Sequence, residues 1–428
     1  MFPRSDTVKI AVIGAGSTYT PELAEGLILE SQVLGLQELY LHDINSERLQ
    51  IVGGLVERMV RAQGSPFQVR QTLDRVEAVA GADFVITQIR VGGQEARALD
   101  TRICLEERII GQETTGPVGF AKAMRTIPVL LDICADIRTY APQAFLINFT
   151  NPAGMITEAV LKHGGVKAIG LCNIPFGLKS AVAKECGVSP QEIELDYVGL
   201  NHLSWVRRIY VSGEDCTAEL LKKQAEKPAN IPGLAFDPDF SRALGMWPNS
   251  YLNYFYLQDE MLAHLKEQPK TRAEVVKELE AQLLDQYKDP QLSSKPKELE
   301  KRGGAHYSSA AVSLIRDIHL NSGRRHIVNV RNNGALTDLP PDAVVEVTSV
   351  VDAQGAKPLS VGRLEAQIRG LIQHVKAYEE LTVEAAVTRN YHTALLALAT
   401  HPLTTSVNKA KRILDRFNAA HNLQLVKA

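Results

Sequence analysis

The sequence has little of what marks several specialised classes of protein. It holds only five cysteines, an odd number scattered between Cys104 and Cys216, so a disulfide framework is not expected. No apolar run reaches the ~18 residues that span a bilayer, and the short polar start lacks the charged-then-apolar order of a secretory signal. The formal net charge of −2 offers no basic surplus for nucleic acid. These absences predict a cytoplasmic protein with reduced thiols that binds neither membranes nor nucleic acid.

The composition that remains is typical of a large globular enzyme. Apolar residues make up 45% and charged residues 22% of a chain of 428 residues. Such a length is too great for one small hydrophobic core. We therefore expect two interleaved domains.

A glycine-rich turn follows the first predicted strand. The β-branched run Val8–Ile13 has the composition of a buried parallel strand, Gly14-Ala-Gly16-Ser-Thr follows at once, and a helical pattern opens at Pro21. A strand, a glycine turn and a helix N-terminus in this order present free backbone N–H groups and the positive end of the helix dipole to an anion. This order predicts a phosphate cradle for a dinucleotide.

Asp43 ends the second predicted strand, Glu38–His42. An acidic side chain at this place can accept hydrogen bonds from both ribose hydroxyls and disfavours a 2′-phosphate, which favours NAD over NADP. The pattern is incomplete, because Tyr19 stands where the usual fingerprint has its third glycine, and the spacing to Asp43 is longer than usual. A glycine turn in another kind of α/β protein is the alternative. The candidate cofactor contacts are Gly14, Gly16, Ser17, Thr18 and Asp43.

Strand and helix patterns alternate over the first ~175 residues. Further strands are expected at 82–89, 145–150 and 167–171, with helices at 99–110 and 120–140. This alternation predicts a doubly wound parallel sheet, in which ligands gather at the carboxyl ends of the strands. Six candidate residues lie at or just after those ends and should line one crevice, namely Gly14, Asp43, Arg90, Asn148, Asn151 and Cys172.

The second half of the chain changes character. Two strands are expected around Gly199-Leu-Asn-His202, a polar loop or lid over 213–250, and an aromatic cluster at 251–256. We therefore predict a Rossmann-like doubly wound parallel sheet followed by an α+β C-terminal domain, the architecture of lactate and malate dehydrogenases. The expected division is an NAD-binding domain over 1–175 and a domain for substrate, metal and oligomerisation over 176–428.

Cys172 and His202 form a candidate metal pair. A thiolate and an imidazole suit a soft-to-borderline divalent ion, and two protein ligands leave positions open for a substrate. The alternative is that Cys172 is a buried packing residue and His202 a core histidine whose hydrogen bonds are satisfied by the protein. The strand-end position and the flanking Asn173 and Asn201 favour a metal site more than an arbitrary cysteine–histidine pair would, and the packing alternative stays open.

Three arginines follow the third predicted strand of this series. Arginine is the natural bidentate partner of a phosphate or carboxylate. Arg97 and Arg102 are expected on a helix surface as solvated charges. Arg90, which directly follows the strand, is the better candidate for an anion contact.

Six short motifs, taken together and in order, resemble glycoside hydrolase family 4, the NAD- and manganese-dependent glycosidases. They extend over about 300 residues and leave only the C-terminal helices uncovered. The motifs are Gly14-Ala-Gly-Ser-Thr, Gly111-Gln-Glu-Thr-Thr-Gly-Pro, Asn148-Phe-Thr-Asn-Pro, Cys172-Asn-Ile-Pro, Gly199-Leu-Asn-His and Arg302-Gly-Gly-Ala.

The resemblance implies a role for particular side chains. It assigns the metal to Cys172 and His202 and the role of base to Tyr251, the first residue of the aromatic cluster. Family members that carry an asparagine after the metal cysteine act on β-linked substrates, so Asn173 implies a 6-phospho-β-glucosidase. Two positions depart from the family pattern, Asn253 and His306. The positions that resemble sugar and phosphate contacts are Arg90, Asn148, Asn151 and Asn173.

The reaction implied by the resemblance is hydrolysis of 6-phospho-β-glucosides to glucose 6-phosphate and an aglycone. NAD⁺ oxidises C3 of the sugar, Mn²⁺ or another divalent metal polarises the ketone, and Tyr251 removes the C2 proton before elimination and water addition. The alternatives are a 2-hydroxy-acid dehydrogenase of the malate or lactate type and a protein that binds NAD without turnover. Apolar C-terminal helices are consistent with a homodimer or homotetramer, although a monomer core explains them equally well.

Overall fold

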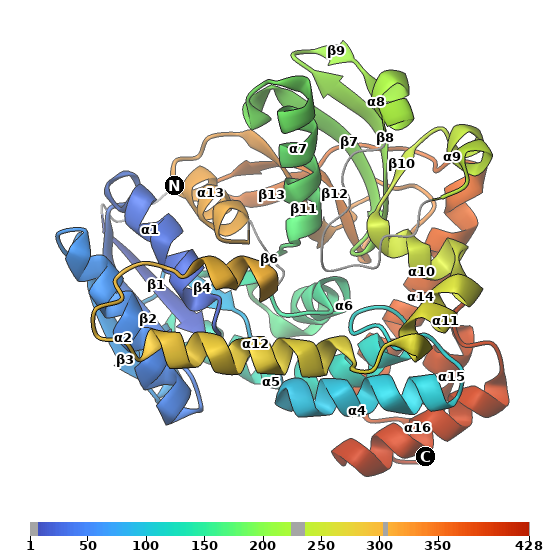
Figure 1. Cartoon of the computed structure of the whole chain (residues 1–428), viewed down its shortest axis with the longest axis horizontal. Coiled ribbons are helices and arrows are strands. Elements are labelled where there is room, and N and C mark those ends of the chain that lie inside the picture. Colours follow the sequence, from blue (N-terminus) through green and yellow to red (C-terminus); the bar gives the residue numbers. More distant parts are fainter. Residues whose placement is uncertain (1–6, 224–235, 303–306, 428) are drawn as a thin grey trace.

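The structure is a computed structural model, and it describes residues 7–223, 236–302 and 307–427 (Figure 1). A sheet of nine strands forms its centre. In spatial order the strands are β13 (Gly355–Pro358), β12 (Val344–Asp352), β11 (Arg324–Arg331), β6 (Lys167–Gly170), β5 (Phe145–Asn148), β4 (Phe84–Thr87), β1 (Val8–Ile13), β2 (Leu36–His42) and β3 (Gln68–Thr72).

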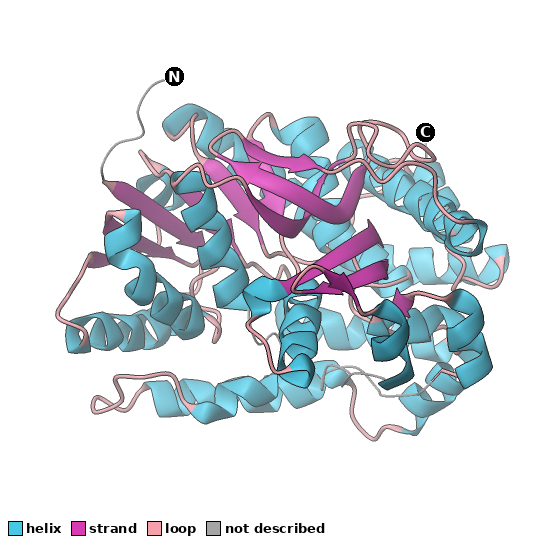
Figure 2. Cartoon of the chain, turned by 90° about the horizontal axis from the view of Figure 1, so that it is seen from above, coloured by secondary structure: helices cyan, strands magenta, loops and turns pink. Residues whose placement is uncertain are grey.

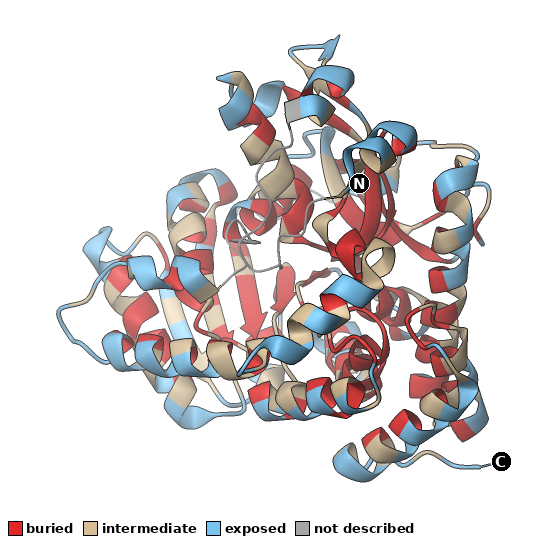
Figure 3. Cartoon of the chain, turned by 45° about the vertical axis from the view of Figure 1, so that its right-hand side comes forward, coloured by how far each residue is buried: buried red, intermediate tan, exposed pale blue. Residues whose placement is uncertain are grey.

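Six of these strands, β1 to β6, are parallel and confirm the predicted doubly wound sheet. Their order, β3-β2-β1-β4-β5-β6, is that of a dinucleotide-binding fold, and it reverses between β1 and β4. Strands β4 and β5 are buried along their whole length because helices cover both faces of the sheet, as Figures 2 and 3 show. The crevice between β1 and β4 is therefore where a ligand is expected.

Helices connect and cover these strands. The first half holds α1 (Thr20–Leu34), α2 (Ser46–Ala62), α3 (Arg75–Val79), α4 (Gly93–Glu106), α5 (Pro117–Tyr140), α6 (Ala153–Ala159) and α7 (Asn173–Cys186). The second half holds α8 (Thr217–Lys223), α9 (Pro238–Leu244), α10 (Asn253–Tyr256), α11 (Gln258–Glu267), α12 (Arg272–Tyr287), α13 (Tyr307–His319), α14 (Ala366–Thr388), α15 (Tyr391–Thr400) and α16 (Val407–His421). Within the described ranges, no helix is both long and apolar enough to cross a membrane.

Helix α4 begins six residues before its expected start at Leu99. Gly92 adopts φ +83°, a left-handed conformation that glycine reaches without a steric penalty, and the helix follows directly. The two adjacent glycines therefore form the turn into the helix and not an extended loop. This earlier start brings Arg97 into the first half of α4.

The second half of the chain contributes to both sheets of the molecule. Strands β11, β12 and β13 add to β6 in antiparallel fashion, so residues far beyond 175 complete the central sheet. A smaller sheet contains β7 (Ile193–Leu200) and β8 (Leu203–Val211), the two strands expected around His202, together with β9 (Glu214–Asp215) and β10 (Trp247–Pro248). The domain division at residue 175 stays a prediction.

Two regions singled out by the sequence are only partly described. The expected polar loop over 213–250 contains β9, α8, α9 and β10, while its residues 224–235 lie outside the described residues. Of the motif Arg302-Gly-Gly-Ala, only Arg302 is described. His306, one of the two departures from the family pattern, also lies outside the described ranges, whereas Asn253 is fully buried.

A buried ion cluster joins α6 to α14. The ammonium of Lys376, 1% exposed, lies 2.7 Å from a carboxylate oxygen of Glu158 and 2.5 Å from one of Glu379. Burial alone would lower the pKa of Lys376, but the two carboxylates raise it above its usual value. Lys162 gives Glu158 a second partner at 3.0 Å. Lys376 is therefore the cation that joins the two carboxylates of Glu158 and Glu379.

We expect Lys376→Met to lower the free energy of unfolding by about 3–5 kcal/mol, because it leaves buried carboxylates without their central partner. The matched control is Lys411→Met, which removes an exposed ion pair to Asp415 on α16 and should change stability little. Urea denaturation of both variants measures the difference. Equal stability of the two variants would show that the cluster is not held by Lys376.

Candidate active site

A cavity of about 1250 Å³ opens at the carboxyl ends of β1, β2 and β4. Helix α12 lies over it, beside α2 and α4 (Figure 1). Three predicted site residues, Thr18, Asn148 and Cys172, are buried and do not contribute to the cavity wall. The predicted residues that do line it are Gly14, Gly16, Ser17, Asp43, Arg90, Asn151, Asn173, His202 and Tyr251.

Asp43 fixes the glycine turn between β1 and α1. One of its carboxylate oxygens accepts from the backbone N–H of Gly16 at 2.8 Å, and the other accepts from that of Asn45 at 2.9 Å. A Cβ on Gly16 would lie only 2.8 Å from the first oxygen, so glycine is required by close approach. Gly14 adopts φ +94°, and its N–H donates to the carbonyl of His42 at 2.9 Å. The predicted cradle is thus held to the end of β2, and each Asp43 oxygen keeps a lone pair for a ribose hydroxyl.

Thr18 and Tyr19 differ in their relation to the cavity. Thr18 is fully buried, and its carbonyl accepts from the hydroxyl of Tyr287 at 2.8 Å, so it joins the turn to α12. Tyr19, which replaces the third glycine, lines the cavity with the guanidinium of Arg302 over its ring at 4.6 Å from the centroid. The turn therefore uses an aromatic side chain where the usual fingerprint has none.

Glu280 fastens α12 over the cavity. Its carboxylate, buried at 7% exposure, accepts from Arg302 at 2.6 Å, from Gln94 at 3.2 Å and from Arg48 at 3.4 Å. These partners belong to three different segments of the chain. Arg48 in turn donates to the carbonyl of Gly16 at 3.0 Å. One carboxylate thereby connects α12 to the glycine turn, to α2 and to α4.

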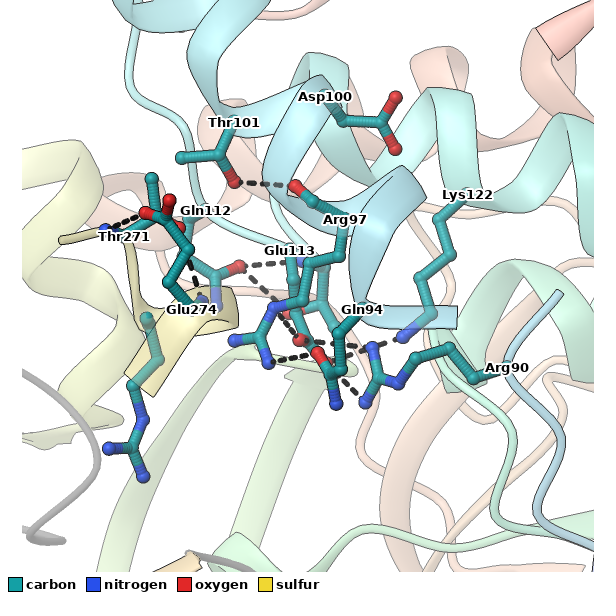
Figure 4. Close-up of polar contacts among 12 residues, drawn as sticks. Arg90, Gln94, Arg97, Asp100, Thr101, Gln112, Glu113, Lys122, Thr271 and Glu274 are labelled. Carbon is teal, nitrogen blue, oxygen red and sulfur yellow. Dashed lines mark hydrogen bonds and ion pairs between the residues drawn. The ribbon is translucent and has the colours of Figure 1, made fainter. Parts of the chain in front are cut away.

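Three cations converge on Glu113 at another part of the cavity wall (Figure 4). Arg90 and Lys122 each lie 3.3 Å from a carboxylate oxygen, and Arg97 forms a third ion pair. Burial favours the neutral form of Glu113, yet the three cations hold its pKa well below its usual range. Burial and the neighbouring Arg90 lower the pKa of Lys122 to about 7. Even with Lys122 neutral, two guanidinium groups share one carboxylate, and the cluster carries excess positive charge.

The prediction that Arg97 is a solvated surface residue is wrong. Its side chain is only 13% exposed, lines the cavity and interacts electrostatically with the phenol of Tyr251. Arg102 does lie on the exposed side of α4, 56% exposed and paired with Glu274. The spacing of Gln94, Arg97 and Thr101 is that of one helix face, and all three line the cavity. That spacing was the signal available in the sequence.

Asn148 organises the end of β5 beneath the cavity. Its side-chain oxygen accepts from Thr87 at 3.1 Å and from the N–H of Thr150 at 3.0 Å, and its nitrogen donates to Thr150 and Thr157 at 3.2 Å each. The amide is fully buried with partners on both ends. The predicted sugar contacts Asn151 and Asn173 do lie in the cavity wall. Asn148 thus holds the loop that carries Asn151.

His202 and Tyr251 stack face to face in the wall. Their ring centroids are 3.8 Å apart and the ring planes are 10° apart. His202 lies in the β7–β8 turn with φ +65°, and its Nδ1 is 2.7 Å from the hydroxyl of Thr114. Burial lowers the pKa of His202 to about 3, so the imidazole is neutral at neutral pH, as a metal ligand must be.

Cys172 packs in the same apolar cluster as Tyr251 and Ile174. Its sulfur accepts from the N–H of Ile174 at 3.5 Å, at the start of α7. Burial raises the pKa of the thiol far above its usual value, so a bound cation is needed to hold it as a thiolate. Among the residues that the structure describes, no group of three or more His, Cys, Asp or Glu side chains could hold a metal ion. Soft sulfur and neutral imidazole fit a divalent ion whose other ligands come from a substrate.

Glu346 is a buried carboxyl that interacts electrostatically with Cys172. No motif or spacing in the sequence marked it as a site residue. It accepts from Asn201 at 2.9 Å, from Asn329 at 3.0 Å and from the hydroxyl of Tyr197 at 3.1 Å. Burial raises the pKa of this carboxyl to about 7. Asn201 precedes His202, so Glu346 holds the residue next to the predicted metal ligand. Its partners are 17 to 149 positions away in the chain, and only the fold brings them together.

These features define a nucleotide-binding enzyme site in which a glycine turn, a cationic cluster and a stacked histidine–tyrosine pair share one cavity. The chain belongs to family 4 of the glycosyl hydrolases. Residues 9–188 match the family 4 glycosyl hydrolase domain, and residues 197–404 match the family 4 glycosyl hydrolase C-terminal domain. The family expected from the six motifs is confirmed.

Relatives match nearly the whole chain. It is 46% identical to a probable 6-phospho-beta-glucosidase of Bacillus subtilis (strain 168), covering 98% of this chain and 97% of that protein. It is 40% identical to the 6-phospho-beta-glucosidase of Escherichia coli (strain K12), covering 97% and 96%. Both relatives therefore align from one end of the chain to the other.

Solved structures confirm the predicted fold. The 6-phospho-beta glucosidase from Thermotoga maritima, solved with NAD and glucose-6-phosphate, superposes with a TM-score of 0.92 at 37% identity and covers 98% of this chain and 99% of its own. The same enzyme, solved with manganese, NAD+ and glucose-6-phosphate, superposes with a TM-score of 0.90 at 36% identity and covers 98% of this chain and 99% of its own. Malate dehydrogenase from Plasmodium falciparum superposes with a TM-score of 0.58 at 15% identity and covers 89% of this chain and 98% of its own. It therefore shares the fold alone.

We expect Gly16→Ala to weaken NAD binding by at least about tenfold, or roughly 1.4 kcal/mol, because the new methyl group displaces Asp43 from the turn. The matched control is Gly370→Ala in α14, where a Cβ meets no atom within 4 Å and the helix should gain about 0.5–1 kcal/mol of stability. Fluorescence titration with NAD⁺ measures the dissociation constant of both variants. An unchanged dissociation constant in Gly16→Ala would remove the turn from the cofactor site.

Proposed function

We propose that this protein hydrolyses 6-phospho-β-glucosides to glucose 6-phosphate and an aglycone, with NAD and a divalent metal such as Mn²⁺ as cofactors. The observation that carries the proposal is that one cavity brings together the glycine turn at Asp43, the cations around Glu113 and the stacked rings of His202 and Tyr251. Relatives at 38–46% identity over nearly the full chain are named 6-phospho-beta-glucosidases, one of them as probable, and the one from Thermotoga maritima is solved with NAD and glucose-6-phosphate.

The cations around Glu113 suit the phosphate of the substrate. Arg90 and Arg97 offer fork-shaped donors that match phosphate oxygens, and Lys122 adds a third donor. A phosphate carries about −1.5 to −2 charges at pH 7 and would balance the excess positive charge of the cluster. Arg272, at the start of α12, also lines the cavity. We propose that this cluster selects phosphorylated over plain sugars.

The chemistry is divided between the cofactors and the side chains. When bound, NAD would take and return a hydride, and a divalent ion would stabilise negative charge on the sugar oxygens. Cys172 and His202 would hold that ion. Tyr251, fixed in orientation by its stack on His202, would accept the proton from C2. Asn173, the neutral amide that lines the cavity next to Cys172, supports a preference for β-linked substrates.

Several earlier predictions belong with this proposal. We propose that the enzyme acts in the cytoplasm, binds no nucleic acid and forms a homodimer or homotetramer. The exposed apolar side chain of Leu396 on α15, 57% exposed, supports a subunit contact on the C-terminal helices. The two parts of the chain proposed for NAD and for substrate are 1–175 and 176–428.

We expect the protein to cleave p-nitrophenyl β-glucoside 6-phosphate only when both NAD⁺ and Mn²⁺ are present. Tyr251→Phe should lose about 10²–10⁴-fold in kcat while it binds NAD⁺ as before. Release of p-nitrophenol is the measurement, with the α-anomer and the unphosphorylated β-glucoside as comparison substrates. Cleavage of the α-anomer instead would overturn the reading of Asn173. NADH that accumulates on a 2-hydroxy acid, without any cleavage, would overturn the proposed function.

We expect Arg97→Met to lower kcat/KM for the phosphorylated substrate by at least about tenfold, since charged hydrogen bonds contribute about 1.5–3 kcal/mol each. Arg102→Met, on the exposed side of the same helix, is the matched control and should retain activity. The unphosphorylated β-glucoside tests selectivity. An equal decrease in kcat/KM for both substrates would mean that Arg97 does not bind the phosphate.

A further inference from the structure

The side-chain oxygen of Gln112 can be identified from its donors. The atom Oε1 accepts from the backbone N–H of Thr114 at 2.7 Å and from that of Thr115 at 2.9 Å. An amide nitrogen cannot accept these bonds, so the atom facing them is the carbonyl oxygen. This oxygen accepts hydrogen bonds and cannot donate one.

The hydroxyl of Thr114 lies between this oxygen and His202. Its Oγ1 is 2.9 Å from Oε1 of Gln112 and 2.7 Å from Nδ1 of His202. A hydroxyl has one proton to donate. The hydroxyl of Thr114 has the geometry of a donor to Oε1 of Gln112, and an oxygen that gives its one proton to Gln112 is left to accept from His202. The imidazole therefore carries its proton on Nδ1 and leaves the lone pair on Nε2.

The loop that carries Thr114 is held firmly in place. The carbonyl of Gly116 accepts from the hydroxyl of Tyr378 at 2.8 Å. At Gly119 a Cβ would lie 2.7 Å from the carbonyl oxygen of Thr114, so helix α5 touches the loop directly. The imidazole is fixed as well, because its face is stacked on Tyr251. Neither partner is free to turn away from the contact.

We propose that Thr114 is a positioning residue that holds His202 in the Nδ1–H tautomer, with Nε2 free to bind the metal ion. The inference rests on the proposed function, because it takes His202 as a metal ligand. Hydrogen bonds to the second nitrogen of a metal-binding histidine set its tautomer and orientation. Here the chain Gln112, Thr114 and His202 supplies that bond from the Gly111–Pro117 loop, which sequence reasoning treated only as a family motif.

The test is the dissociation constant of Mn²⁺, measured from the electron paramagnetic resonance signal of free Mn²⁺ with the NAD-bound protein. Thr114→Val cannot accept from Nδ1 and should bind Mn²⁺ about 10–100-fold more weakly. Thr114→Ser keeps the hydroxyl and should bind within about threefold of the unmodified protein. The Mn²⁺ concentration for half-maximal activity should rise in Thr114→Val, and kcat at saturating Mn²⁺ should recover.

The outcomes separate the inference from the function it rests on. Equal Mn²⁺ affinity in Thr114→Val and the unmodified protein would overturn the role of Thr114. A lower unfolding temperature with weaker NAD⁺ binding in Thr114→Val, not restored in Thr114→Ser, would also overturn it, since the residue would then be structural. If the unmodified protein binds no Mn²⁺, the proposed metal dependence itself fails.

Discussion

The carboxylate of Glu113 is the group on which the arrangement of the cavity depends. It is buried, and burial of a charge is tolerated only where opposite charges accompany it. Its partners are Arg90 after β4, Arg97 in α4 and Lys122 in α5. One acidic side chain therefore sets the relative positions of two helices and a strand end. The same loop carries Thr114, so the placement of Glu113 also determines what His202 meets.

The polar side chains around the site form two layers at different depths. The outer layer, which includes Asn151, Asn173 and Tyr251, faces the cavity. Beneath it, Asn148 and Glu346 satisfy backbone and side-chain donors and keep the outer residues in place. A substitution in the deeper layer would act through position, because those side chains do not reach the cavity. The residues that support the site thus lie beneath those that face the cavity, and Asn148 and Asn151 show this division within one short motif.

Five of the six parallel strands were predicted from the sequence, because buried parallel strands are continuous apolar runs that end at glycine or polar residues, whereas the polar edge strand β3 was not predicted. Asp43, Cys172 and His202 stood out for the same reason, since each follows a strand. Arg97 was expected on the solvated face of a helix, but with Gln94 and Thr101 it lies on the face of α4 that lines the cavity. Strand-end position also could not separate Asn151, which faces the cavity, from Asn148, which does not. Thr114 and His202 are 88 positions apart, and no local pattern reports a contact of that kind.

The fastening of α12 by Glu280 has a consequence for how the enzyme would handle its nucleotide. A dinucleotide beneath this helix would leave more slowly while the contacts of Glu280 to Arg302, Gln94 and Arg48 hold the helix in place. Slow exchange would limit a dehydrogenase, which must release its spent cofactor after every turnover. A hydrolase that returns its hydride ends each cycle with the nucleotide it began with. In such an enzyme, a helix held over the cavity would keep NAD bound from one turnover to the next. One NAD molecule would then serve many substrate molecules in succession.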